Sequence, residues 1–272
     1  MKEIMEVKIS FNYYPHGKKK ALTMSYDDGQ VFDRKLVEIF NRYGIKGTFN
    51  LNSGKFGAEP YVSKDEIKKL YEGHEVAVHT VDHPYLTLIP KEELVYQIME
   101  DRKNLETLVG YQVRGMAYPF GDYSHALAKE LKAFGIEYSR TVNSTRSFRI
   151  PSNFLEWHPT CHHDQDVIQK LKEFKDVPEW EQMPLFYVWG HSFEFDRNGN
   201  WDLIEEFCKM ASFDKTVWYA TNIEIMDYIN ALKSLKFSAD GSMVYNPSAI
   251  PVWIGVDGEP VKIDPGEKIY LK

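Results

Sequence analysis

Short apolar runs alternate along the chain with segments whose apolar residues repeat at helical spacing. This alternation limits the fold more than any other feature of the sequence. We expect strands at 19–26, 45–51, 74–79, 111–118, 135–141 and 184–191. We expect helices at 33–44, 63–73, 90–110, 124–135, 201–210 and 222–236. Repeated strand–helix units predict an α/β fold with a parallel sheet, open or closed into a barrel.

The last part of the chain has a different texture. From Phe237 onward, Asp-Gly turns at 240–241 and 257–258 separate β-prone runs, which predicts small antiparallel strands. This segment is too short to form its own core, so it should pack on the main domain or on a partner subunit. We therefore expect a barrel domain at 1–236 and a β extension at 237–272.

Composition excludes several classes of function. The net charge of −7 over 272 residues gives no support to nucleic-acid or anionic-membrane binding. Two cysteines make neither a disulfide framework nor a Cys-rich metal site. The first 17 residues carry charges throughout, and no window reaches the apolar length of a membrane span. We expect a cytoplasmic protein and leave homo-oligomerisation open.

Two adjacent carboxylates, Asp27 and Asp28, close the first apolar run. Neighbouring side chains of a strand point to opposite faces. Both carboxylates can serve one site only if the strand ends there and Gly29 lets the chain turn. The alternative is a solvated Asp-Asp-Gly turn. In parallel strand–helix folds, sites gather at the C-terminal ends of strands, which is where this pair lies.

Histidines follow two other predicted strands. His79 and His83 are four residues apart, and Pro84 disfavours a helix at His83, so we expect both on the loop after a strand. His191 ends the run at 184–191, a position that suits an acid–base residue. The alternatives are surface-loop histidines and a hydrogen-bonded core histidine. Two imidazoles and one carboxylate make a three-ligand set with an open position, which is typical of catalytic zinc.

These residues resemble motifs of the polysaccharide deacetylase family, the NodB-homology fold of carbohydrate esterase family four. "SYDDG" at 25–29 is similar to its Thr-Phe-Asp-Asp-Gly motif, and "HTVDH" at 79–83 meets its His-(Ser/Thr)-x-x-His motif. "YPFG" at 118–121 resembles part of the third motif, and "VWGH" at 188–191 lies where Leu-x-His would fall. The likeness covers about residues 21–191.

The resemblance implies an irregular seven-stranded (β/α) barrel and a metal-dependent hydrolase. The enzyme would remove acetyl groups from an N-acetylated, or alternatively an O-acetylated, carbohydrate. Asp27 would be the general base, His191 the general acid, and the backbone N–H of Phe120 the oxyanion donor. The implied cofactor is one divalent ion, expected to be zinc, with cobalt, nickel and iron as alternatives. Its implied ligands are Asp28, His79 and His83.

Two departures from the family pattern concern the substrate side of the site. The third motif's arginine, which holds the base, is replaced by Ala117. Arg114 would lie on the opposite face of its strand, so we expect Arg140 to be the replacement. The fourth motif, whose aspartate tunes the acid histidine, has no match. A cluster of histidines and aspartates at 158–166 lies near another strand end, where it could line the site or form a solvated loop.

We expect three side chains to contact the substrate: Tyr118, Trp189 and His162. Trp189 replaces the last-motif leucine, and it would either wall an acetyl pocket or fill core. Two other functions stay open. One is a hydrolase of the same fold that acts on another C–N bond, such as a cyclic imide or allantoin. The other is a non-catalytic carbohydrate-binding domain.

Overall fold

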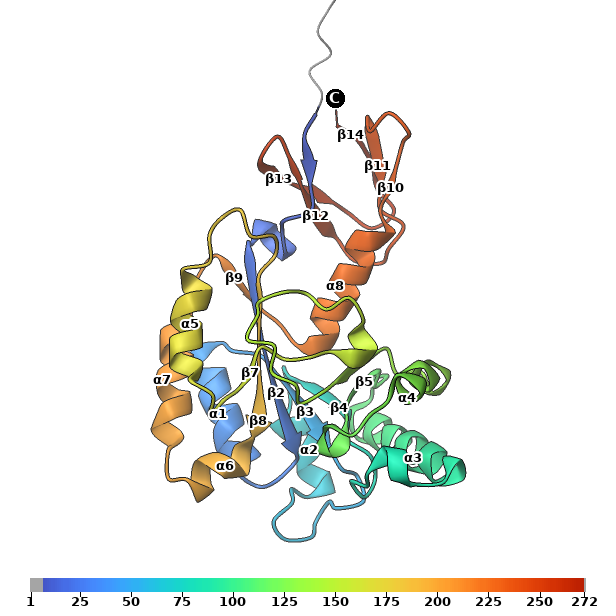
Figure 1. The fold of residues 1–272 in the computed structure, drawn as a ribbon, viewed down its shortest axis with the longest axis vertical. Helices are drawn as coiled ribbons and strands as arrows, with labels where there is room; N and C mark the ends of the chain where they lie inside the picture. Colours follow the sequence, from blue (N-terminus) through green and yellow to red (C-terminus); the bar gives the residue numbers. More distant parts are fainter. Residues whose placement is uncertain (1–6, 272) are drawn as a thin grey trace, which may run out of the picture.

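The computed structural model describes residues 7–271, and its centre is a curled sheet of parallel strands (Figure 1). The main path of this sheet runs β6-β5-β4-β3-β2-β8-β7, and β9 pairs with β2 outside that path. The strands are β2 (Lys20–Asp28), β3 (Gly47–Leu51), β4 (Glu75–Val78), β5 (Gly115–Ala117), β6 (Tyr138–Arg140), β7 (Cys161–His162), β8 (Leu185–His191) and β9 (Val217–Tyr219).

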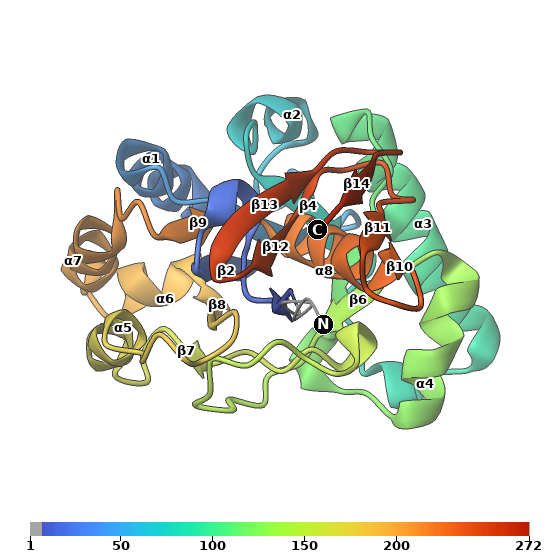
Figure 2. The same cartoon turned by 90° about the horizontal axis from the view of Figure 1, so that it is seen from above.

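Helices surround this sheet, as the view from above shows (Figure 2). They are α1 (Asp33–Tyr43), α2 (Ile67–Leu70), α3 (Lys91–Val109), α4 (His125–Glu130), α5 (Val167–Lys175), α6 (Ser192–Arg197), α7 (Trp201–Ala211) and α8 (Asn222–Ser234). Short 3-10 helices occupy Pro15–Gly17, Lys64–Glu66, Leu86–Leu88, Pro119–Gly121, Leu131–Phe134 and Phe154–Glu156.

The first helix shows how the sequence produces this layer. Leu36 and Phe40, four residues apart on one face of α1, are fully buried against the sheet. Gly44 ends the helix in the left-handed region at φ +64°, where a residue without a Cβ carries little strain. Each helix returns the chain to the start of the next strand, so the C-terminal ends of all the strands meet at one end of the sheet.

The arrangement confirms the predicted irregular seven-stranded barrel. All pairings within the main sheet are parallel. The strands β6 and β7 at the two edges are not joined directly. A single parallel bridge between Arg140 and Trp157 extends the β6 edge toward the segment that leads into β7. The barrel is therefore not closed between β6 and β7.

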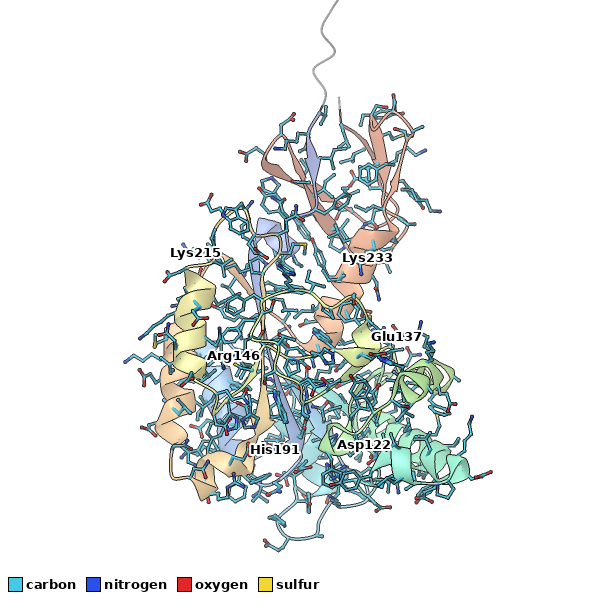
Figure 3. The ribbon with its side chains drawn as sticks, viewed as in Figure 1. Asp122, Glu137, Arg146, His191, Lys215 and Lys233 are labelled. Atoms are coloured by element: carbon cyan, nitrogen blue, oxygen red, sulfur yellow. The ribbon has the colours of Figure 1, made fainter. Side chains whose placement is uncertain are left out.

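Two small antiparallel sheets lie at the end of the barrel opposite His191 (Figures 1 and 3). One joins β1 (Ile9–Ser10), β12 (Val252–Val256) and β13 (Glu259–Ile263). The other joins β10 (Lys236–Phe237), β11 (Met243–Tyr245) and β14 (Lys268–Tyr270). A strand from the N-terminal part of the chain thus pairs within the extension, which the sequence had placed entirely after Phe237.

The extension shares a hydrophobic cluster with the barrel. Val252 and Ile254 of β12 are buried with Tyr228 and Ile229 of α8 and with Tyr187 of β8. We propose that residues 1–236 and 237–272 form the barrel and its extension, with the β1 strand added to the latter. Among residues 7–271, no helix combines the length and apolarity that crossing a membrane requires.

Candidate active site

Asp27 and Asp28 are the last two residues of β2, and their carboxylates turn to the same side. Asp28 has a φ of +81°, which interrupts the alternation of side chains along the strand. As a result, Nε2 of His79 lies 3.8 Å from an oxygen of Asp27 and 3.8 Å from an oxygen of Asp28. Gly29 continues the turn at φ +69°. The two carboxylates therefore face one site, as the sequence predicted for a strand that ends there.

Asp28, His79 and His83 bring three ligand atoms together. The Nε2 atom of His83 lies 3.8 Å from Asp28 Oδ1, and all three ligand atoms lie within 4.8 Å of one another. His79 directly follows β4, and His83 stands on the next loop at φ +64°, outside the right-handed helical region. The loop conformation agrees with the expectation drawn from Pro84.

This group fits a divalent ion. Nδ1 of the His79 ring lies 2.8 Å from the Ala117 carbonyl oxygen, which fixes the N–H on that nitrogen. Its Nε2 is buried and has no hydrogen-bond partner among the described residues. Burial lowers the pKa values of both His79 and His83 to about 4, so both rings are neutral at pH 7 and carry a free lone pair.

Asp27 lies beside this group and is held as an anion. It is 3% exposed, and it accepts hydrogen bonds from the Arg140 guanidinium and, at 2.8 Å, from Asn50 Nδ2. Burial would raise the pKa of Asp27, but the positive charge of Arg140 and its hydrogen bond outweigh burial and lower the pKa to about 2. Asp27 thus lies close to the ligand group, but its charge is paired with Arg140. It is therefore available as a base rather than as a ligand.

His191 ends β8 and faces Asp27 from the neighbouring strand. Its Nε2 lies 4.0 Å from Asp27 Oδ2, and the two residues are paired in register. Its Nδ1 lies 3.3 Å from Glu194 Oε2, at the start of α6. Burial alone would lower the pKa of His191, but the carboxylates of Glu194 and Asp27 outweigh burial and raise it.

The Pro119–Gly121 turn brings Phe120 to the rim of the site. Phe120 has a φ of +58°, and its ring packs edge-on against His83, with centroids 4.3 Å apart. The ring is 53% exposed and stacks on Tyr85 at 4.0 Å. The side chain of Phe120 therefore contacts His83 of the ligand group, from the loop after β5.

Comparison with known proteins agrees with this arrangement. The polysaccharide deacetylase family profile matches residues 15–139. In sequence, this part of the chain is similar to the polysaccharide deacetylase family.

Curated relatives align with this chain over only part of their own length. A peptidoglycan-N-acetylglucosamine deacetylase of Listeria monocytogenes is 28% identical over 122 residues, which is 44% of this chain and 26% of the Listeria protein. Chitin deacetylase 1 of Cryptococcus neoformans is 24% identical over 144 residues, which is 52% of this chain and 30% of the fungal protein. The chain thus spans between a quarter and a third of these relatives.

The fold extends beyond the matched segment. A crystal structure from Mycobacterium smegmatis, described as that of a polysaccharide deacetylase, has a TM-score of 0.62 to this chain at 17% identity. The alignment covers 82% of this chain and 94% of the mycobacterial one. At that identity the likeness concerns the polysaccharide deacetylase fold alone.

The family's missing arginine has a spatial counterpart. Ala117 of β5 pairs in register with Arg140 of β6, one strand over. Arg140 is fully buried, contacts Asp27 and lies with its guanidinium carbon 4.4 Å from the centre of the Trp189 ring. Arg114 instead binds Asp227 on the far side of its strand. The structure therefore places Arg140, as the sequence suggested, against Asp27.

The histidine and aspartate cluster at 158–166 divides into two parts. Nε2 of His162 lies 3.0 Å from Glu194 Oε2, and Nε2 of His163 lies 3.4 Å from the same oxygen. His158 instead contacts the Thr141 hydroxyl at 2.6 Å, away from Glu194. Only the middle of the cluster therefore reaches the site. The remaining acidic side chains, Asp164 and Asp166, are 59% and 81% exposed.

Two of the three expected substrate contacts lie near the site, and one does not. Trp189 packs edge-on against His162, with ring centroids 4.6 Å apart, and both are close to His191. Tyr118 is 1% exposed, and its hydroxyl donates to the Leu155 carbonyl at 2.7 Å. Because a side chain buried in this way cannot reach a substrate, Tyr118 is a core residue, and the expectation for it was wrong.

The sequence did not single out three residues that support the site. Glu194 faces His191 from three residues further along, at capping-box spacing. Asn50 holds Asp27, and Asp101 accepts from the His79 backbone N–H at 3.0 Å. The spacing of Glu194 after a predicted acid histidine was visible in the sequence. Asn50 and Asp101 lie on other elements, and nothing in their local sequence marks them.

Proposed function

We propose that this protein hydrolyses acetamide groups on a carbohydrate. One observation carries the proposal: the three-ligand group, the charge-paired Asp27 and the acid-type His191 meet at the C-terminal ends of β2, β4 and β8. The family assignment supports a deacetylase that acts on carbohydrate. Removal of an O-acetyl group by the same residues is the less favoured variant.

A divalent ion would be held by Asp28, His79 and His83, and it would supply Lewis acidity toward water and the substrate carbonyl. Zinc suits this set of two imidazoles and one carboxylate, and cobalt, nickel or iron could replace it. The neutral rings of His79 and His83 support this assignment, because an imidazole must be deprotonated to bind an ion.

The protein's own residues divide the proton transfers. Asp27, which Arg140 and Asn50 hold in place, takes a proton from the attacking water. The backbone N–H of Phe120 donates to the oxyanion of the tetrahedral intermediate. His191, whose pKa is raised, gives a proton to the departing amine. His191 Nε2 and Asp27 Oδ2 lie 4.0 Å apart, so the acid and the base border the same position in the site.

The substrate proposal rests on relatives that match only part of their length. The Listeria protein is named for the N-acetylglucosamine of peptidoglycan, and the Cryptococcus protein is named for chitin. For this chain we propose an N-acetylated amino sugar within an oligosaccharide or polysaccharide. A cytoplasmic location stays a prediction, and a soluble oligosaccharide would suit it better than a cell wall.

Acetate release tests the proposal directly. The purified protein, reconstituted with zinc or cobalt, should liberate acetate from N-acetylglucosamine oligomers and lose this activity with a chelator. O-acetylated sugars, cyclic imides and allantoin are assayed beside them, because the altered third and fourth motifs leave another C–N bond as the alternative. If the protein hydrolysed only a cyclic amide, that class of compound would replace the acetylated sugar as the proposed substrate. Sugar binding without turnover in the presence of metal would favour a binding domain.

Arg140 gives a prediction specific to this chain. Arg140→Ala should lower kcat on the order of 10²-fold, since Asp27 would lose its cation in a buried position and hold its proton more tightly. Adding Ala117→Arg should restore part of the activity, because positions 117 and 140 are paired in register. The measurement is kcat against pH, where the acid limb should move upward in the single variant.

Arg114→Ala is the matched control, because Arg114 binds Asp227 away from the site. It should leave kcat unchanged. If Arg140→Ala matched wild type in kcat and pH profile, Arg140 would have no part in holding the base.

A further inference from the structure

Two histidine rings, those of His162 and His191, converge on one carboxylate oxygen of Glu194. Glu194 Oε2 lies 3.0 Å from His162 Nε2 and 3.3 Å from His191 Nδ1. These three ligand atoms lie within 4.8 Å of one another. Ligands bound to a tetrahedral zinc at about 2.0–2.2 Å are separated from one another by about 3.3–3.6 Å. The 3.3 Å contact has this spacing and the 3.0 Å contact is slightly shorter, so the three side chains are close enough together to surround one ion.

Glu194 Oε2 accepts a hydrogen bond from the His191 backbone N–H at 3.2 Å, but the ring nitrogen of His191 is left for another partner. Nδ1 of His191 is buried and lacks a hydrogen-bond partner within residues 7–271, although Glu194 Oε2 is only 3.3 Å away. A hydrogen bond needs the oxygen to lie along the N–H direction. His79 Nε2, in the first ligand group, has the same combination of close carboxylates and no hydrogen bond.

A further contact completes the environment of His162. Its second ring nitrogen, Nδ1, lies 2.5 Å from Asp164 Oδ1. In metal sites, a histidine ligand commonly donates its other ring N–H to a carboxylate, which fixes the tautomer and makes the ligand nitrogen more basic. Nδ1 also lies 3.3 Å from the Asp164 backbone nitrogen. A proton on Nδ1, directed to the Asp164 carboxylate, would leave the Nε2 lone pair of His162 on the side where Glu194 and His191 lie.

We propose that His162, His191 and Glu194 form a second divalent-cation site, distinct from Asp28, His79 and His83. The donor set is two imidazoles and one carboxylate, the same chemistry as the first group, so it should take zinc or cobalt. No ligand is shared between the two sites, but His191 also faces Asp27 with its other nitrogen. A cation bound at the second site must therefore affect His191 in its role as the general acid.

The effect on catalysis, which rests on the proposed function, is inhibition. As an acid, His191 carries protons on both ring nitrogens. A cation on Nδ1 displaces that proton to solvent, and the neutral ring that remains is a far weaker acid at Nε2. Activity should rise as the first site fills and fall as the second fills.

Metal stoichiometry tests the site without reference to activity. The chelator-stripped full chain is titrated with Co²⁺ or Zn²⁺ by calorimetry, and the Co²⁺ absorption spectrum is followed in parallel. Wild type should bind two equivalents, and His162→Gln should bind one. Asp164→Asn, an exposed change that should not affect folding, should weaken the second equivalent by about 10–100-fold and leave the first unchanged.

His158→Gln is the matched control, because this histidine of the same loop contacts Thr141 and belongs to neither group. It should keep both equivalents. One equivalent in wild type, or a second equivalent that survives in both His162→Gln and Asp164→Asn, would overturn the second site. Two equivalents without any fall in acetate release would overturn the inhibition alone. Two equivalents in a protein that releases no acetate would leave the site standing and count against the proposed function.

Discussion

Asp27→Asn should retain metal and lose turnover by roughly 10²–10⁴-fold. The amide has the size of the carboxylate and can keep a contact with Asn50, but it cannot accept the proton of the attacking water. The first ligand group should be undisturbed, because its ligands are Asp28, His79 and His83. The measurements are metal content by elemental analysis and kcat for acetate release at saturating substrate.

Asp166→Asn serves as a control for the loss of one negative charge, because Asp166 is 81% exposed on a loop. It should change neither quantity. If Asp27→Asn lost its metal, Asp27 would be a ligand and the two adjacent aspartates would have exchanged roles. If it kept full turnover, the base would have to be another group.

Asp28→Asn should have the opposite pattern. Removal of the anionic ligand leaves two neutral imidazoles, so metal affinity should fall by at least about 10²-fold, and turnover at limiting metal should fall with it. Because Asp27, Arg140 and His191 remain in place, excess metal should restore part of the activity. A titration of kcat against metal concentration measures both effects.

His83→Gln is the matched comparison, since His83 belongs to the same ligand group but comes from the loop after β4. It should also be rescued in part by metal. Asp28→Asn with wild-type affinity and activity would remove Asp28 from the ligand set. At high metal concentration the proposed second site would also fill in both variants, which would limit the activity that is recovered.

The sequence predicted the barrel, and it predicted that Asp28, His79 and His83 would lie together, because both depend on local signals. An apolar run that ends at Asp27 and Asp28, and a loop bounded by Pro84, fix where those side chains emerge from the sheet. The same locality explains the missed elements. The two-residue β7 and three-residue β9 are strands only because β8 and β2 lie beside them, so they carry little periodicity of their own.

The second part of the site depended on long-range packing. His162 and Glu194 meet across two elements 32 residues apart in the chain, and no spacing rule connects them. Tyr118 stands next to a motif proline and seemed to face the substrate. The turn instead directs it inward to Leu155, because an aromatic ring at a strand end can as easily fill core as reach solvent.

The position of Arg140 at the end of β6 has a consequence for the folding of the chain. Asp27 and Arg140 are separated by 113 positions, and both are almost completely buried. A fragment that stops before β6 is complete would have to bury the Asp27 carboxylate without its cation, which costs several kcal/mol unless the group takes up a proton. The segment matched by the family profile ends at residue 139, one position before Arg140. A fragment limited to the segment that the profile matches is therefore not expected to form a stable site by itself. A truncation drawn at that boundary removes the countercharge of its own buried acid, and the strands that follow are required before the site can carry a stable charge.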